Sequence, residues 1–112
     1  MPRTAGKTGA DAADGVTLAL GCALPDGAAG LVLPGPEALE PGLLAGLKVR
    51  QVICPLVGRD FDALAVAERL AALGHAGPLV VLAGALPNPR MVEREIRKQG
   101  AGVEVQIVAR AP

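Results

Sequence analysis

Residues 51 to 84 constrain the fold most, because two apolar runs flank an amphipathic segment there. The run 52–56 is apolar at every position, and 78–84 (PLVVLAG) is nearly so, as is typical of strands buried on both faces of a parallel sheet. Between them, apolar residues recur at helical spacing, which predicts a helix capped by Asp60 or Asp62. A strand, a helix and a second strand predict a right-handed crossover in a parallel sheet.

Flanking segments extend this pattern in both directions. Downstream, Asn88 and Pro89 open a predicted helix that Gly100 closes, and residues 103–108 alternate as a half-exposed edge strand does. Upstream, residues 16–23 and 30–35 are predicted strands, and 36–47 hold one or two helical turns interrupted by Pro41. The turn at residues 24–30 leaves open whether the first two strands are parallel or form a hairpin.

The prediction is therefore an α/β fold. We expect a small flavodoxin-like domain over residues 16–112, with a mostly parallel sheet of four or five strands, behind a mobile tail at 1–15. The layers form either a three-layer sandwich or an incomplete, two-layer one. Residues 24–30 are too short for a crossover helix, and no helix follows the last strand. One sheet face should lack helical cover and serve as an interaction surface.

Composition limits the partners. Lys and Arg together number 11, as do Asp and Glu, so no net basic charge attracts nucleic acid or anionic lipid. Phe61 is the one aromatic residue, which disfavours base stacking. No apolar run approaches the roughly 18 residues of a membrane span, and no secretory signal opens the sequence. Two cysteines in such a chain favour reduced thiols and a cytoplasmic location. We expect no cofactor and no metal.

A few residues stand out as candidates for a site. Cys22 and Cys54 are expected near the ends of neighbouring strands, where they either approach each other or serve as small buried apolar side chains. Gly58, Arg59 and Asp60 follow the strand that ends near Pro55, at the edge where open α/β sheets bind ligands. There Arg59 either clamps an anion or is an ordinary surface residue.

Two further residues invite the same question. Arg90 lies near a helix N-terminus, where it either contributes to an anion site or belongs to a well-capped loop. His75, the one histidine, follows the helix-ending Gly74 and is expected to be a solvated loop residue. The chain has no Ser or Tyr and offers His75 no nucleophile partner, so triad chemistry is not expected.

Residues 49–84 resemble the third strand, third helix and fourth strand of response-regulator receiver domains. The stretch 61–64 (FDAL) stands where receivers have a turn similar to MDGL, and 74–84 (GHAGPLVVLAG) matches the approach to their fourth strand. The resemblance covers about a third of the chain well and about two thirds loosely. It implies a flavodoxin-like fold.

The residues of receiver chemistry are replaced in this chain. The acidic pair that would hold magnesium falls near Gly21 and Cys22, the phosphate-accepting aspartate at Pro55, the hydroxyl residue near Ala83 and the lysine within 108–110. Asp60 and Asp62 remain nearby, but as helix caps. The resemblance thus implies a degenerate receiver that does not take a phosphate on aspartate.

These observations predict a non-enzymatic receiver-like module that acts through protein contacts in bacterial signalling. The expected partner is a second copy of the chain or another protein domain, with no nucleic acid and no membrane. Its expected contacts are the uncovered sheet face and the loops that carry Arg59 and Arg90. The alternative is a small ligand-binding or thiol-redox module that uses the strand-end crevice near Cys22 and Cys54.

Overall fold

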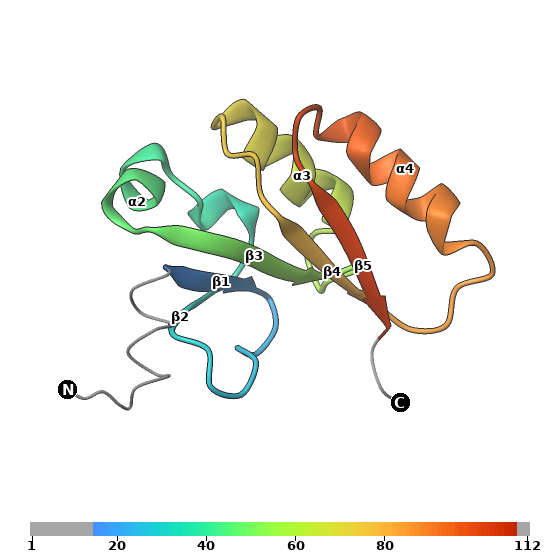
Figure 1. Cartoon of the computed structure of the whole chain (residues 1–112), viewed down its shortest axis with the longest axis horizontal. Helices are drawn as coiled ribbons and strands as arrows, with labels where there is room; N and C mark the ends of the chain where they lie inside the picture. The colour runs from blue at the N-terminus through green and yellow to red at the C-terminus, as the bar shows by residue number, and fades with distance from the viewer. Residues whose placement is uncertain (1–14, 110–112) are drawn as a thin grey trace.

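The computed structural model describes residues 15–109, which fold around one five-stranded sheet in which every pair of neighbours is parallel (Figure 1). The strand order is β2-β1-β3-β4-β5, the order of flavodoxin-like folds. The α/β prediction is confirmed, and the first two strands are parallel. The strands are β1 (Val16–Leu20), β2 (Gly30–Leu33), β3 (Val49–Pro55), β4 (Leu79–Ala83) and β5 (Val105–Ala109).

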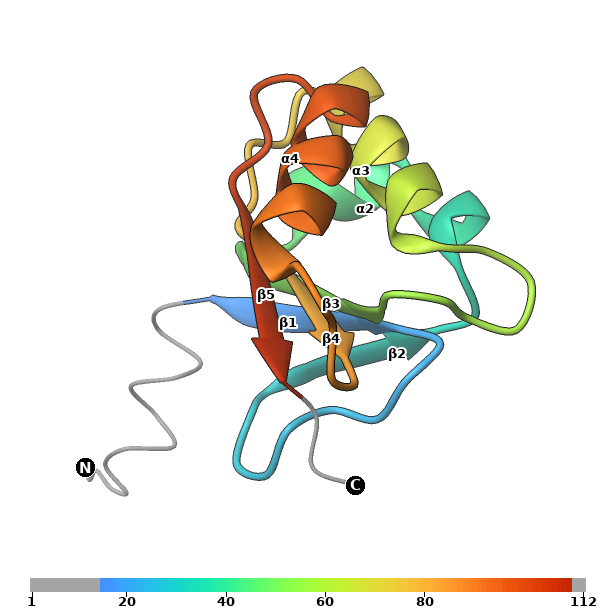
Figure 2. The ribbon, with the colours of Figure 1, turned by 90° about the vertical axis from the view of Figure 1, so that its right-hand side faces the viewer.

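The helical elements lie together on one side of the sheet (Figure 2). They are η1 (Pro36–Ala38), α2 (Pro41–Gly46), α3 (Ala63–Ala72) and α4 (Pro89–Gln99). Pro41 begins α2, so it separates the two short helical pieces as expected. Asn88 accepts a hydrogen bond from the Met91 N–H at 3.2 Å and caps α4, and Gly100 follows the last helical residue. The predicted bounds of this helix are confirmed.

The start of α3 settles which carboxylate caps it. The Asp62 side chain accepts a hydrogen bond from the Ala65 N–H at 2.9 Å, so Asp62 rather than Asp60 is the cap. The helix buries Val66, Ala67 and Leu70. Arg69, on the same helix, is half-buried. Its guanidinium donates two hydrogen bonds, of 3.2 and 2.7 Å, to the carbonyl of the buried Leu39.

The core lies between the sheet and the helices. Side chains from alternate strand positions fill it together with residues of α3 and α4, and the largest fully buried members include Leu18, Leu20, Leu39, Leu70, Leu79, Ile96, Val52 and Val81. The crossover from β1 to β2, residues 21–29, contains no helix. It runs along the other side of the sheet (Figure 2).

The sheet face opposite the helices carries no helix within residues 15–109, as the crossover argument predicts. This has a consequence for β4, which was expected to be buried on both faces. Leu79, Val81 and Ala83 are buried, but Val80 and Leu82, on the other face, are only half-buried. That expectation is wrong because nothing helical packs against this side. β3, in contrast, is buried from Val52 to Pro55.

Three smaller differences concern the ends of elements. β1 ends at Leu20, because Gly21 adopts a φ of 68° and turns the chain out of the strand, so Cys22 lies beyond it. β5 begins at Val105 rather than at residue 103. The mobile tail expected for 1–15 falls outside the described residues except for Gly15, which is buried next to the Val16–Lys48 backbone hydrogen bond of 2.6 Å.

Candidate functional site

The carboxyl ends of the strands lie at one edge of the sheet, where parallel α/β folds place their ligands. In the order β2-β1-β3-β4-β5, the connections diverge between β1 and β3, and a crevice opens there in ligand-binding relatives of this fold. Gly21 directly follows β1, while Pro55 and Ala83 are the last residues of β3 and β4. Gly21, Pro55 and Ala83 therefore lie at this edge, and none of them carries a polar side chain.

The ring of Phe61 lies between the glycines of three neighbouring loops. A Cβ atom added to Gly21 would lie 2.8 Å from the ring, one added to Gly35 would lie 3.1 Å from it, and one added to Gly58 also 3.1 Å. The Gly58 N–H donates to the Phe61 carbonyl at 2.7 Å, which fixes the loop that carries the ring. Phe61 thus covers the end of β1, where the crevice of a ligand-binding protein would begin.

This arrangement predicts that Gly21 tolerates no larger residue. Gly21→Ala would place a methyl group against the Phe61 ring in a left-handed backbone conformation, so we expect a loss of more than about 1 kcal/mol of unfolding free energy. The control is Gly84→Ala, since a Cβ there meets nothing within 4 Å and its φ is not positive. Urea unfolding of both variants should separate them, and equal stabilities would contradict the packing of Phe61 on Gly21.

The two cysteines do lie near each other at this edge. Cys54 is fully buried, and both cysteines are thiols rather than a disulfide. The Cys22 thiol lies 3.7 Å from the carbonyl oxygen of Ile53, to which it donates. Burial, and to a lesser extent Cys22 and Asp62, raise the pKa of the Cys54 thiol to about 12. A thiol held protonated is a poor nucleophile and a poor metal ligand.

The raised pKa of Cys54 predicts a stability change at alkaline pH. The protonated thiol stabilises the fold fully below about pH 9, the ordinary thiol pKa, and this contribution is lost as the pH rises toward 12. The unfolding free energy of the native chain should therefore fall more steeply between pH 9 and 12 than that of Cys54→Ala. Cys22→Ala, a matched control, should keep a slope near the native one.

Urea titrations at intervals over that pH range provide the measurement. Parallel slopes for the native chain and Cys54→Ala would show that Cys54 ionises as easily in the folded protein as in the unfolded one. That result would contradict the burial of the thiol.

The remaining polar candidates are spread out rather than gathered. Arg59 and Asp60 are exposed in the loop between β3 and α3, and Arg90 is exposed in the first turn of α4. Arg90 borders a shallow depression together with Glu93, Arg94 and Arg97. Among residues 15–109, no three His, Cys, Asp or Glu side chains are grouped so that they could hold a metal ion.

His75 differs from its expected role as a solvated residue. Its backbone N–H donates to the Leu70 carbonyl at 2.9 Å and, with Gly74 at a φ of 74°, closes α3. Its Nε2 atom, however, is buried with no hydrogen-bond partner. Burial lowers the pKa of His75, which favours the neutral ring. His75 therefore ends the helix through its backbone and not through a positive charge.

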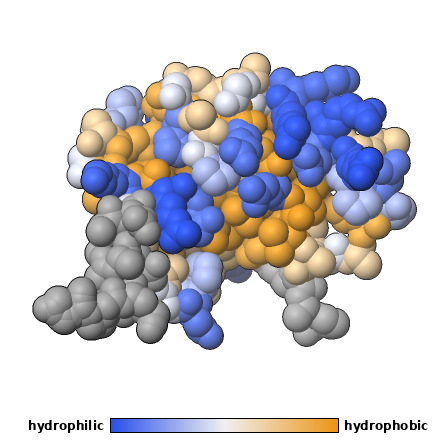
Figure 3. All heavy atoms as spheres, viewed as in Figure 1, coloured by the Kyte–Doolittle hydropathy of each residue, from blue (hydrophilic) through white to orange (hydrophobic). Residues whose placement is uncertain are grey.

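The open face of the sheet is the more distinctive surface. We use this name for the side chains that point away from the helices: Thr17, Ala19, Val32, Gln51, Ile53, Pro55, Val80, Leu82, Gln106 and Val108. None of them is charged, in a chain of which 20% is charged. Val32 is 58% exposed and Val108 42% exposed. Figure 3 shows apolar atoms over β4 and β5 on this side.

One end of the open face is covered and polar. The Gln51 amide donates to the Thr17 hydroxyl at 3.1 Å. These two residues line a small hollow together with Gly15, Arg50 and residues 25–29 of the β1–β2 crossover, so the charged Asp26 and Arg50 border this end of the face. The sequence predicted a sheet face without helical cover. It did not predict the hydrogen bond between Gln51 and Thr17, because the two residues are 34 positions apart.

In the middle of this face Thr17, Ala19, Ile53 and Pro55 are buried. Its accessible apolar side chains therefore lie toward the two edges of the sheet: Val32 on β2, and Val80, Leu82 and Val108 on β4 and β5.

Comparisons with known proteins give no relative: no protein-family model, no curated protein and no solved structure matches the chain. Over residues 15–109, no helix combines the length and the apolar character that crossing a membrane requires. The fold and the chemistry of its surfaces are therefore the basis for a functional proposal.

Proposed function

We propose that this chain is a non-enzymatic, receiver-like module that acts by protein association in bacterial signalling, with the open face of the sheet as its docking surface. The observation that carries the proposal is that this face has neither charged side chains nor helical cover, and that its part at β4 and β5 keeps apolar side chains accessible, with Val108 exposed and Val80 and Leu82 half-buried. An apolar, uncovered sheet face is costly in water unless another surface packs against it.

The residues at the carboxyl ends of the strands support the same proposal. The places of the receiver carboxylates are taken by Gly21, Cys22 and Pro55, and the ring of Phe61 packs against Gly21. An aspartyl phosphate needs oxygen ligands for a hard cation and a carboxylate nucleophile. Neither is provided by these residues, so association rather than phosphoryl transfer is the function that the geometry favours.

The ligand-binding or thiol-redox alternative has less support. It requires a reactive thiol in the crevice near Cys22 and Cys54, whereas the raised pKa of Cys54 keeps its thiol protonated. Cys22 is half-buried and already donates to a backbone carbonyl. This arrangement is the one expected of small buried side chains.

Site-specific photo-crosslinking tests the docking surface. A benzophenone amino acid placed at Val108, on the open face, should give light-dependent adducts with a protein partner in cells that express the chain. The same group at Val57, which is 76% exposed in the β3–α3 loop, is the matched control and should give few or none. Adducts from position 57 but not from 108 would contradict the proposal and direct attention to the strand-end loops.

A further inference from the structure

We propose that the outer side of α4, beside the edge strand β5, binds an extended, acidic segment of a partner protein. We call this surface the arginine flank: Arg90, Arg94 and Arg97 with the apolar hollow that adjoins them. It is separate from the open face, because Arg97 contacts Val105, whose side chain is buried in the core, whereas Val108 points to the opposite side of the sheet. The inference therefore goes beyond the proposed function and does not depend on it.

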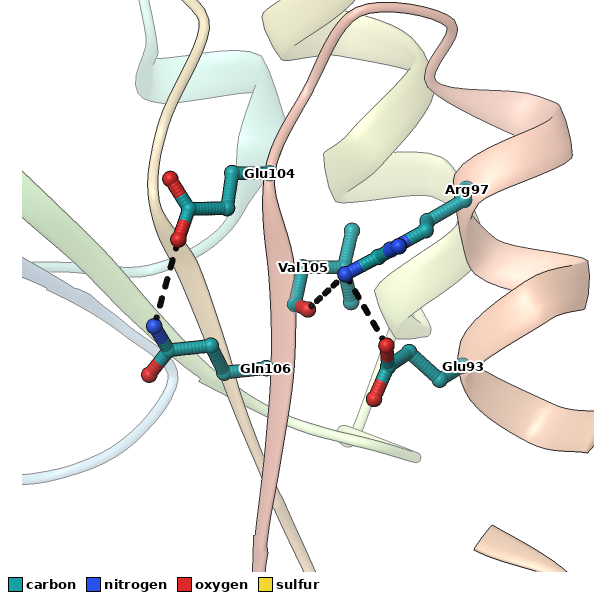
Figure 4. A network of polar contacts seen from close by, with 5 residues as sticks. All are labelled: Glu93, Arg97, Glu104, Val105 and Gln106. Carbon is teal, nitrogen blue, oxygen red and sulfur yellow. Dashed lines mark hydrogen bonds and ion pairs between the residues drawn. The ribbon is translucent and has the colours of Figure 1, made fainter. Parts of the chain in front are cut away.

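Arg97 is held in place at one end of the flank. Its guanidinium donates to the Val105 carbonyl at 3.1 Å and pairs with the Glu93 carboxylate at 2.9 Å, while Glu104 and Gln106 lie on the other side of the β5 ribbon (Figure 4). Of the described residues that border the depression on α4, Glu93 is the one carboxylate. Because Arg97 pairs with it, that carboxylate does not balance the other two arginines.

Arg90 and Arg94 carry charges that the described chain leaves unbalanced. Both are exposed, and neither forms an ion pair within residues 15–109, whereas Lys98 pairs with Glu95 at 3.8 Å. They are four positions apart on the helix, so their like charges repel each other. Arg90 also lies in the first turn of α4, which holds no acidic residue, and a positive charge there opposes the helix dipole. Such local conflicts are expected where a side chain serves binding rather than folding.

An apolar hollow of about 180 Å³ adjoins the arginines. The residues that line it come from the β4–α4 loop, the start of α4 and the end of β5: Gly84, Ala85, Leu86, Pro89, Ile107 and Ala109. Pro89 meets the end of β5 in this hollow, while Arg97 reaches Val105 at its beginning, so α4 runs antiparallel to β5. The hollow and the charged depression therefore follow one another along the same flank, with Arg90 next to the hollow.

The spacing of the arginines indicates the shape of the ligand. Four residues along a helix advance by about 6 Å. In an extended segment, every second side chain lies on the same side, about 6.6 Å from the previous one. Two carboxylates at alternate positions can therefore meet Arg90 and Arg94, and each guanidinium can donate two hydrogen bonds to a carboxylate. An apolar side chain two positions away, on the same side, would enter the hollow.

The charges also indicate how strong this binding is. Exposed ion pairs contribute little each and are screened by salt. The chain as a whole has no net charge, so the attraction acts at the flank and not over the whole molecule. We therefore expect a dissociation constant on the order of 100 μM at low salt.

Fluorescence anisotropy with the full chain tests this inference. The probe is a labelled peptide with leucine, glutamate and glutamate at alternate positions and threonine between them. Binding should weaken several-fold when the salt concentration rises from about 20 to about 200 mM. Arg94→Glu should weaken it at least about tenfold, because the reversed charge repels the peptide. The matched control is Arg59→Glu, which reverses an exposed arginine in the β3–α3 loop and should bind as the native chain does.

Arg90→Glu separates binding from folding. A carboxylate in the first turn of α4 is favoured by the helix dipole and can pair with Arg94, so the variant should be at least as stable to urea as the native chain. Its affinity for the peptide should nevertheless fall at least about tenfold, as for Arg94→Glu. Native affinity in this variant would contradict the assignment.

Other results would overturn the inference. The absence of binding at millimolar peptide in low salt excludes the site, and an equal loss in Arg59→Glu would show that only the overall charge matters. Equal binding of a peptide with glutamine in place of glutamate would exclude recognition by charge. Displacement of the peptide by inorganic phosphate at lower concentration than by unlabelled peptide would make the flank a small-anion site instead. Crosslinking from position 108 tests the open face separately, so either proposal can fail without the other.

Discussion

The handedness of chain crossovers decides on which side of the sheet each part of this molecule lies. Parallel strands joined by right-handed crossovers send their connections to one face when the chain progresses in one direction along the sheet, and to the other face when it reverses. Here the connections from β2 onward all progress toward β5, and only the step from β1 to β2 reverses. The helices therefore lie on one face, and the helix-free crossover of residues 21–29 lies on the other.

The two candidate surfaces, the carboxyl edge of the sheet and its open face, have different chemistry. At the carboxyl ends of β1 and β3, where the fold offers a ligand site, Phe61 packs on three glycines and Cys54 is buried as a protonated thiol. On the open face, Val32, Val80, Leu82 and Val108 are exposed or half-exposed without charged neighbours on the face. Burial of apolar area supplies most of the free energy of association, which is why the second surface is the one proposed for docking.

Much of the fold could be predicted because local signals and the fold agree. Asn88, Pro89 and Gly100 delimit α4 by side-chain capping and by the loss of an N–H donor, both of which act within a few residues. The run 79–83 was misread for a physical reason. An apolar strand has the same sequence whether its second face is covered by helices of the same chain or left open for another surface, so β4 alone cannot distinguish the two.

The candidate site was predicted less completely. Sequence order correctly placed Cys22, Cys54 and Pro55 near the strand ends, because strand ends follow from strand positions. The contacts of Phe61 with Gly21, Gly35 and Gly58 were missed, since they join four separate positions in the sequence. The one sequence feature that pointed to this packing is that Phe61 is the only aromatic residue in a chain with 15 glycines. The hydrogen bonds from Arg69 to Leu39 were missed for the same reason, as an exposed-face arginine of a helix usually faces water.

The central claim is that apolar side chains of β2, β4 and β5 on the helix-free face of the sheet are accessible to solvent in the isolated chain. Methyl NMR with a soluble paramagnetic probe, at a concentration where the chain is monomeric, tests it most directly. The account predicts strong relaxation of the Val32, Leu82 and Val108 methyl groups and little effect on Val52, Val81 and Leu79, which pack against the helices. Equal protection of the two sets would contradict it, because the open face would then be covered by the chain itself.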